Sequence, residues 1–240
     1  ADYPGKFILK FSKKNRGITN SSNVANFSCN GKYIAWMYGD DLLLPGKISK
    51  QVKYMEERPE CSICYHNLEV FDSDTGKVLS YFNENIKLDG DIKTAIRYGT
   101  FNGACSNMVR KDKTPENGFN ILIPVASDWL YWIETLASGG TINYIDEVLG
   151  RYRRHVGNVT AISTEIRQNE VDHLLTCQLL LALYPHYSSD IFFRYSQLIF
   201  MLRGKLKYSD AVLLSIIKKP SMKSFFRLFL HYISLKKLRI

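Results

Sequence analysis

A chain of 240 residues with a hydrophobic fraction of 45% and a charged fraction of 23% has an ordinary globular composition and is long enough to bury one sizeable core. We expect neither a membrane-spanning helix, which needs roughly 18 to 20 apolar residues, nor a signal peptide, because residues 1–15 are polar. The net charge is +9, and residues 201–240 alone hold ten Lys or Arg against one Asp. This pattern favours a neutral catalytic body with a basic tail over a nucleic-acid-binding protein.

The first 60 residues alternate between short apolar runs and helical patterns. Apolar runs bounded by turn residues predict strands, and a capping residue before a periodic stretch predicts a helix. In chain order, the first two are a strand at 7–11 and a helix from Thr19 to about 29, with Val24 and Phe27 on one side. A strand at 33–37 follows, and its composition is that of a parallel strand covered on both faces. The last is a helix from Pro45-Gly46 to about 58.

The middle of the chain continues this alternation. It predicts two or three strands within 60–80, with a hairpin turn at 74–76, and then a helix at 92–98 and a strand at 103–109. A polar loop at 111–124 leads to a helix that starts at Asp128 and is capped by Ser127. Two strands, at 142–145 and 148–153, complete this part.

Beyond residue 163 the pattern becomes helical throughout, with apolar periodic stretches at 171–183, 191–202, 211–217 and 225–235. The predicted fold is therefore an α/β domain over residues 1–160, followed by an all-helical, basic extension over residues 161–240.

Five cysteines are present, and Cys61 and Cys64 form a C-x-x-C pair. A second cysteine or histidine pair at the spacing of a zinc site does not follow. We interpret the cysteines as reduced core residues of a cytoplasmic protein rather than as metal ligands.

An acidic pair, Asp40 and Asp41, follows the apolar run at 33–37. Ligand sites of open α/β sheets lie at the carboxyl ends of strands, and carboxylate oxygens suit Mg²⁺ or Mn²⁺ bound together with substrate phosphates. The alternative is a solvated turn in which an aspartate caps the following helix.

The surroundings of this pair are similar to the family 2 glycosyltransferases. The match consists of Asn15-Arg-Gly, then Asn20 and Asn23, the segment 31–41, and Pro45-Gly-Lys-Ile-Ser-Lys-Gln-Val. The resemblance covers residues 3 to 160 and implies a GT-A-type fold, a nucleotide-diphosphate sugar as donor, a divalent metal and inversion at the anomeric carbon. It assigns a metal-binding role to Asp40 and substrate binding to Asn15, Gly17, Asn23 and Asp41. One departure is Tyr38, which stands where the family often has an acid and could pack against sugar or ribose.

A second motif, 125–132, places an acid at the start of a helix rich in aromatic residues. The resemblance assigns the general base to Asp128, which would deprotonate the acceptor hydroxyl. The alternative is an acid favoured by the helix dipole. Trp129 is expected to stack on a sugar, with core packing as the alternative.

A third motif, 150–160, resembles a family pattern of Tyr-Arg-x-His followed by Asn and Ser/Thr, matched by Tyr152, Arg153, His155, Asn158 and Thr160. The resemblance gives Arg153 a phosphate or substrate contact and makes His155 the second metal ligand beside Asp40. The alternative is a basic surface loop paired with nearby acids.

The family pattern normally begins with a βαβ segment of about 70 to 80 residues that binds the nucleotide, and residues 1–15 do not match it. We therefore expect the chain on its own to be inactive. The predicted function is an inverting, metal-assisted glycosyltransferase of the hexosyltransferase type, acting on a glycan or lipid-linked acceptor in cell-surface polysaccharide biosynthesis. The alternative is a non-catalytic binding or scaffold module on the same fold.

The basic stretch 225–240 mixes aromatic and cationic residues. It predicts either an amphipathic helix on an anionic membrane surface, which would make the protein peripheral at the inner face of the cell membrane, or a helical extension that packs on the body.

Overall fold

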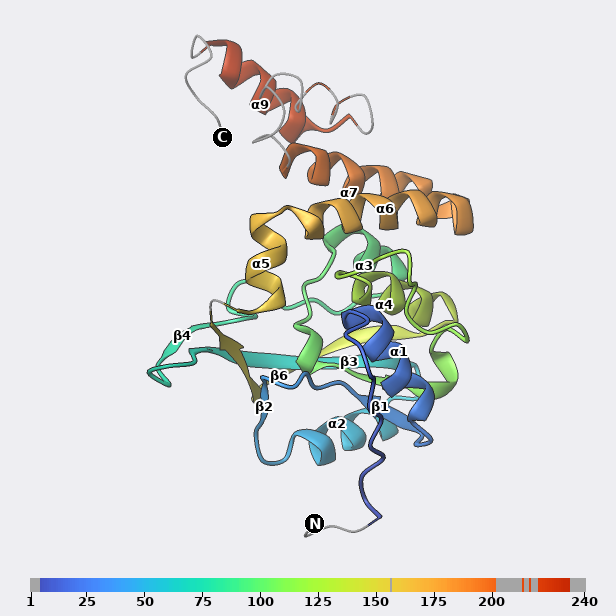
Figure 1. Cartoon of the computed structure of the whole chain (residues 1–240). Helices are drawn as coiled ribbons and strands as arrows, with labels where there is room; N and C mark the ends of the chain where they lie inside the picture. The colour runs from blue at the N-terminus through green and yellow to red at the C-terminus, as the bar shows by residue number, and fades with distance from the viewer. Residues whose placement is uncertain (1–4, 156, 202–212, 214–215, 217–219, 234–240) are drawn as a thin grey trace.

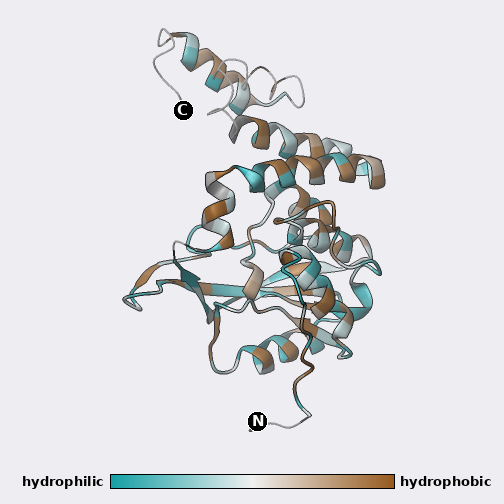
Figure 2. Cartoon of the chain, in the orientation of Figure 1, coloured by the Kyte–Doolittle hydropathy of each residue, from teal (hydrophilic) through white to brown (hydrophobic). Residues whose placement is uncertain are grey.

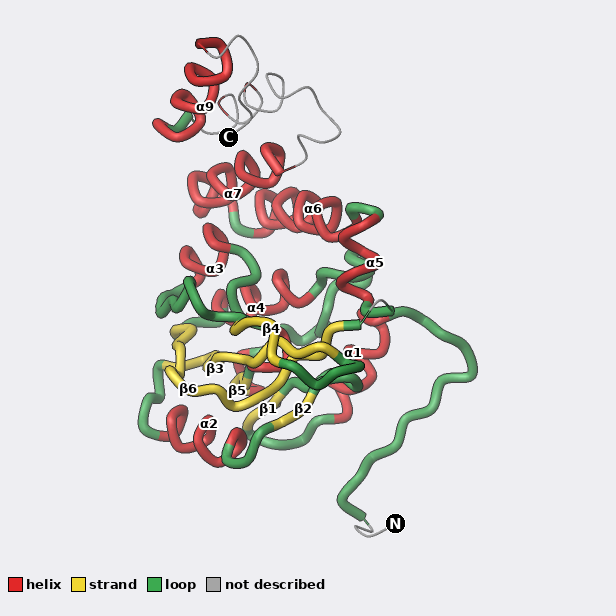
Figure 3. Tube along the Cα trace, turned by 90° about the vertical axis from the view of Figure 1, so that its left-hand side faces the viewer, coloured by secondary structure: helices red, strands yellow, loops and turns green. Residues whose placement is uncertain are grey.

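The structure is a computed structural model that describes residues 5–155, 157–201, 213, 216 and 220–233. Its centre is one mixed sheet of six strands (Figure 3). The strands follow the order β1 (Tyr33–Ala35), β5 (Met108–Arg110), β3 (Cys61–Asp72), β6 (Thr141–Arg154) and β2 (Leu42–Leu43), and β4 (Val78–Tyr81) pairs with β3 outside this path. None of the described helices is long and apolar enough to cross a membrane.

The two long strands β3 and β6 form the backbone of the sheet and run parallel, whereas the other pairs are antiparallel. Their register runs from Cys61 opposite Thr141 to Asp72 opposite Arg154, with an irregularity after His66. The two strands predicted at 142–145 and 148–153 are therefore one strand interrupted by a bulge. The β3–β4 hairpin confirms the turn predicted at 74–76.

Helices cover both faces of this sheet (Figure 1). Helix α2 (Lys47–Glu56) lies on one face, over a small core that includes Met55, Cys64 and Met108. Helices α1 (Ile18–Ser28), α3 (Ile92–Tyr98) and α4 (Asp128–Ala137) lie on the other, which holds the larger core. A mixed sheet flanked by helices confirms the predicted fold class, and the predicted helices at 46–58, 92–98 and 128–136 are confirmed.

The C-terminal part is helical, as predicted. Helix α5 (Val159–Glu165) follows β6, and α6 (Gln168–Leu183) and α7 (Ser188–Met201) lie together above α3 (Figure 1). An ion pair between Arg97 Nη1 and Asp190 Oδ1 at 2.8 Å ties α3 to α7. Helix α9 (Met222–Ile233) lies farthest from the sheet. The helix predicted at 211–217 falls almost wholly outside the described residues.

Four elements predicted in the first half of the chain differ from the structure. Residues 7–11 belong to no strand, and Phe7, Ile8, Leu9 and Phe11 are each more than 60% exposed. A strand needs a neighbour for its backbone hydrogen bonds, and this segment leaves the sheet as a loop (Figure 3). Segment 103–109 forms a short 3₁₀ turn at 104–106 before β5 begins.

Strand β1 was predicted as a parallel strand covered on both faces, but it pairs antiparallel with β5 and ends the described strand order. Helix α1 begins at Ile18, so Thr19 lies inside the helix rather than at its cap. Its buried residues are polar, and Val24 and Phe27 are 47% and 59% exposed. The polar face turns inward because it has partners there: the Thr19 hydroxyl donates to Ile123 O at 2.7 Å.

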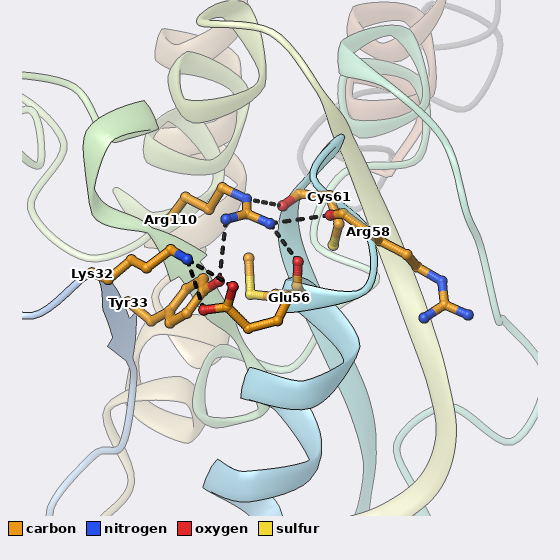
Figure 4. Close-up of polar contacts among 7 residues, drawn as sticks. Lys32, Tyr33, Glu56, Arg58, Cys61 and Arg110 are labelled. Atoms are coloured by element: carbon orange, nitrogen blue, oxygen red, sulfur yellow. Dashed lines mark hydrogen bonds and ion pairs between the residues drawn. The ribbon is translucent and has the colours of Figure 1, made fainter.

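Arg110 in β5 joins the end of α2, the start of β3 and strand β1 (Figure 4). Its guanidinium donates to the carbonyl oxygens of Met55 at the end of α2, of Arg58, and of Cys61 at the start of β3. It also donates to the Tyr33 hydroxyl at 3.1 Å. The guanidinium of Arg110, which is always charged, joins these three carbonyl groups in one network, so this residue has a structural role.

Candidate functional site

A pocket of about 260 Å³ lies where the ends of several elements meet. Its walls come from the loop after β1, the segments before α4 and around residue 100, the end of β6, and the starts of α5 and α6. The polar residues among its lining are Tyr38, Asp40, Asp41, Thr100, Asn102, Asp128, Tyr152, Arg154, Asn158, Thr160, Asn169 and His173. The fold therefore brings the acidic pair and the predicted base into one cavity.

The acidic pair is held in place by Arg153 at the end of β6. The Arg153 Nε donates to the main-chain oxygen of Asp40 at 2.7 Å, and its backbone N–H donates to Asp41 Oδ1 at 3.1 Å. Its Nη1 also donates to the Ser73 hydroxyl at 3.3 Å. Arg153 is not among the residues that line the pocket. Its hydrogen bonds hold the acidic loop in place, and the substrate contact assigned to it stays a prediction.

Asn158 links the acidic pair to the third sequence motif. Its Nδ2 donates to Asp40 Oδ2 at 2.8 Å, and its Oδ1 accepts from the backbone N–H of His155 at 2.6 Å. The His155 Nε2 lies 3.5 Å from the same Asp40 Oδ2. The two side chains predicted as metal ligands are thus neighbours in space, although they lie far apart in the sequence.

These two groups alone offer few ligands to a metal ion. Among the described residues there is no cluster of three or more His, Cys, Asp or Glu side chains that could hold a metal ion. Mg²⁺ commonly binds through one or two protein carboxylates and takes its other ligands from substrate phosphates and water. Asp40 and His155 fit a metal bound in that way, together with a donor that supplies phosphate oxygens.

Asp41 is buried, with 6% of its surface exposed. Its Oδ2 atom lies below the surface and accepts no N–H or O–H hydrogen bond within the described part of the chain, and the neighbouring Cys105 side chain favours the charged form of this carboxylate. Burial raises the pKa of Asp41, and the hydrogen bond from the Arg153 backbone opposes that rise. A buried carboxylate oxygen without a donor is costly, and Asp41 lines the pocket, where a bound hydroxyl could satisfy it.

Asp128 begins α4 and lines the same pocket as the acidic pair. The backbone N–H of Trp129 donates to its Oδ1 at 2.9 Å. Burial nevertheless raises the pKa of Asp128 to about 6, because the surrounding protein disfavours the charged carboxylate. A carboxylate with a pKa in this range can both take and hold a proton near neutral pH, as a general base needs to do.

Two side chains that the sequence did not single out hold the segment before Asp128. Asp172 on α6 is 1% exposed, and its Oδ2 accepts from the backbone N–H groups of Val125 and Ala126, each at 2.9 Å. Thr19 on α1 contacts the Ser127 hydroxyl at 2.9 Å. Helices α1 and α6 therefore position the predicted base from both sides.

The remaining predicted residues lie outside the pocket. Trp129 is completely buried and donates from Nε1 to Ala95 O at 2.9 Å, which favours the alternative of core packing over stacking on a sugar. The Asn23 amide exchanges two hydrogen bonds with the Phe119 backbone. The Asn15 side chain accepts from the backbone N–H of Gly17, which has a φ of 82° that suits glycine, so these two form a local turn.

Tyr38, Tyr152 and Arg154 also line the pocket; from the sequence, only Tyr38 was given a possible contact with sugar or ribose, and Tyr152 was named only as part of the third motif. Tyr38, in the place of the family acid, lines the pocket, and burial raises its pKa, to which the charge of nearby Asp128 adds. Tyr152 contacts the Thr160 hydroxyl at 3.0 Å, and the guanidinium of Arg154 lies 4.8 Å from the Tyr152 ring centre. Side chains alternate between the two faces of a strand, so Tyr152 and Arg154 of β6 lie on one face and Arg153 lies on the other.

Comparison with known proteins agrees with this geometry. A family model described as Glycosyl transferase family 2 matches residues 1–114. An uncharacterised glycosyltransferase of Haemophilus influenzae is 31% identical over 169 residues, which cover 66% of this chain and 51% of the relative. The amylovoran biosynthesis glycosyltransferase AmsE of Erwinia amylovora is 27% identical over 144 residues, or 59% of this chain and 52% of the relative.

The crystal structure of S. aureus TarS 1-349 has a TM-score of 0.56 to this chain, with 92% of this chain and 68% of that chain covered and 11% identity. At this identity the likeness shows the fold alone, which is of the GT-A type. The chain spans about half the length of the curated relatives that it matches.

Proposed function

Because residues 1–114 belong to the Glycosyl transferase family 2, we propose that this chain carries a sugar-transfer site. The donor is a nucleotide-diphosphate sugar, and the acceptor is a hydroxyl group of a glycan or a lipid-linked glycan. The observation that carries the proposal is the single pocket that joins the acidic pair Asp40 and Asp41 to Asp128, whose pKa is raised to about 6. A donor side and a base side are what such a transfer requires.

On the donor side, Asp40 and His155 would hold Mn²⁺ or Mg²⁺, because their Oδ2 and Nε2 atoms lie 3.5 Å apart and hydrogen bonds from Arg153 and Asn158 hold Asp40 in place. When bound, the metal offsets the negative charge that develops on the leaving diphosphate. The unpartnered Oδ2 of Asp41 accepts a hydrogen bond from a hydroxyl of the donor.

On the acceptor side, Asp128 takes the proton from the attacking hydroxyl. The acceptor oxygen forms a bond to the anomeric carbon, the bond from that carbon to the diphosphate oxygen breaks with its electron pair, and the proton stays on the Asp128 carboxylate. One base opposite one leaving group gives a single displacement, which inverts the anomeric centre. We place this reaction in the cytoplasm, where the five free cysteines stay reduced.

The experiment measures Mn²⁺-dependent release of nucleotide diphosphate by the full-length protein, rather than by these 240 residues alone, from a panel of UDP-, GDP- and dTDP-sugars. The wild type is compared with Asp40→Ala, and Asp112→Ala serves as a matched control because Asp112 is an exposed acid outside the pocket. We expect Asp40→Ala to fall at least a hundredfold and Asp112→Ala to match the wild type.

If all three proteins release nucleotide diphosphate only at the background rate, the proposed enzyme activity is contradicted. That result favours the second candidate function, a non-catalytic binding or scaffold module. Two observations support that candidate: Tyr38 stands where the family often has an acid, and the described residues contain no cluster of three metal-ligating side chains. A donor that still binds, with an affinity that Asp40→Ala reduces, would identify such a binding module.

A further inference from the structure

Helix α9 (Met222–Ile233) carries an apolar stripe that faces away from the protein. Its members follow the i, i+3, i+4, i+7, i+10, i+11 spacing of one helix face. They are Met222, Phe225, Phe226, Phe229, Tyr232 and Ile233, with exposed fractions of 86%, 49%, 59%, 59%, 53% and 62%. The buried residues of the same helix are Ser224 and His231.

This arrangement is the reverse of an ordinary surface helix, which buries its apolar stripe against the core and exposes its polar face. Six aromatic or aliphatic side chains on one short helix form a contiguous apolar surface, and such surfaces in soluble proteins mark interaction sites. Helix α9, with hydrophobic residues along its length, lies at the end of the molecule farthest from the sheet (Figure 2). The stripe is therefore available to a partner without displacing any contact of the α/β domain.

The charges around the stripe indicate which partner it fits. The described stretch 220–233 contains Lys223 and Arg227 and no acid, and Lys223 is exposed at the border of the stripe. The sequence continues with Lys236, Lys237 and Arg239, again without an acid. The exposed charge at the border of the stripe, Lys223, is therefore a cation. An apolar face with a cation at its border fits the interface of a bilayer with anionic lipids, which is apolar in its interior and negatively charged at its headgroups.

A second copy of the chain fits this helix less well. Two α9 helices packed through their stripes would bring the Lys and Arg residues of both copies together, without acids on either helix to pair with them, and like charges at close range destabilise such a contact. A spanning arrangement is also too short, because twelve residues at 1.5 Å per residue reach about 18 Å, well below the roughly 30 Å of a bilayer core.

We propose that α9 lies in the plane of an anionic membrane surface, with its aromatic stripe at the boundary between headgroups and acyl chains and its cations at the headgroups. The inference rests on the helix and not on the sugar-transfer site. It adds a partner, a lipid surface, that would keep the protein close to membrane-bound material.

The test is sedimentation of the whole protein with vesicles of phosphatidylcholine alone or of equal parts phosphatidylcholine and phosphatidylglycerol. We expect binding to the anionic vesicles at least tenfold stronger than to the neutral ones, and a loss of binding as salt rises. The double variant Phe226→Ser/Phe229→Ser should bind the anionic vesicles at least tenfold less, and Lys223→Glu should bind them less than the wild type.

The matched control is Phe27→Ser on α1, because Phe27 has the same 59% exposure as Phe226 and Phe229 but lies on the α/β domain. It should bind vesicles like the wild type, and thermal unfolding checks that each variant stays folded. Binding that does not depend on anionic lipid, or that the α9 variants leave unchanged, would overturn the proposal. A wild type that forms dimers in light scattering and ignores vesicles, with the double variant monomeric, would show a second copy to be the partner.

Discussion

Replacement of Asp172 by alanine tests whether α6 holds the segment that presents the predicted base. The Asp172 carboxylate is 1% exposed, accepts from the backbone N–H groups of Val125 and Ala126, and also accepts from Gln168 Nε2 at 2.7 Å. Alanine removes all three bonds and leaves two backbone donors in a protein interior without a partner.

The expected size of the effect follows from those contacts. A hydrogen bond to a charged group contributes about 1.5–3 kcal/mol, and relief of the desolvation of a buried carboxylate offsets part of the loss. We expect Asp172→Ala to lower the free energy of unfolding by about 3 kcal/mol, which corresponds to roughly 6–12 °C in Tm for a chain of this size. Asp172→Asn keeps the shape and one acceptor oxygen, so it should lose about 1 kcal/mol.

Urea unfolding measured by circular dichroism gives the stability, and donor release under saturating conditions gives kcat. The account predicts that kcat falls for Asp172→Ala while donor affinity changes little, because the acidic pair lies on a different loop. An unfolding free energy within about 0.5 kcal/mol of the wild type, the size of an ordinary surface substitution, would refute the inference that Asp172 carries this segment.

Three further predictions concern single side chains. Asp128 must be ionised to act as a base, so kcat/KM should rise with pH through about 6 and level off above it, and Asp128→Asn should abolish that rise. Lys47 is 1% exposed, and burial lowers its pKa to about 8. Its charge therefore destabilises the fold below that pH, and the stability of the wild type relative to Lys47→Met should increase between pH 8 and 10.5 by up to about 3 kcal/mol in urea unfolding. Trp129→Ala should lower stability by about 3–5 kcal/mol, and Trp129→Phe should leave donor affinity unchanged in calorimetry, whereas a sugar-stacking role would weaken it.

The sequence predicted the elements whose patterns are local. Helix α3 was predicted with the bounds that the structure gives, because Asp91 caps it through its side chain and Gly99 follows it with a φ of 73°. The failures concern contacts between distant segments. The orientation of α1 depends on polar contacts with distant segments, such as the hydrogen bond from Thr19 to the carbonyl oxygen of Ile123, about a hundred residues later in the chain. The spacing of residues within the helix does not reveal such contacts.

The same distinction applies to where the structure places the predicted site residues, whose roles stay predictions. The motif resemblance selected Asp40, Asp128 and His155, and the fold places two of them on the pocket and the third beside Asp40. It could not separate Arg153 from Arg154, because adjacent strand residues point to opposite faces and only the register of β6 decides which one meets the cavity.

Asp172 was missed for a different reason. It lies within a helix whose sequence pattern is dominated by apolar residues, and its role depends on two backbone N–H groups of a loop earlier in the chain. Backbone donors leave no trace in the side-chain sequence of that loop, so a partner of this kind becomes visible only in the structure.

The most direct test of the central claim, that one pocket has a donor side and a base side, is a paired measurement on Asp40→Asn and Asp128→Asn. Donor affinity is measured by calorimetry with Mn²⁺, and the rate of sugar transfer is measured in the same buffer at pH 7.5. The account predicts that Asp40→Asn loses donor affinity, while Asp128→Asn binds the donor like the wild type and transfers the sugar at least a hundredfold more slowly. Full transfer activity in Asp128→Asn, or unchanged donor affinity in Asp40→Asn, would contradict it.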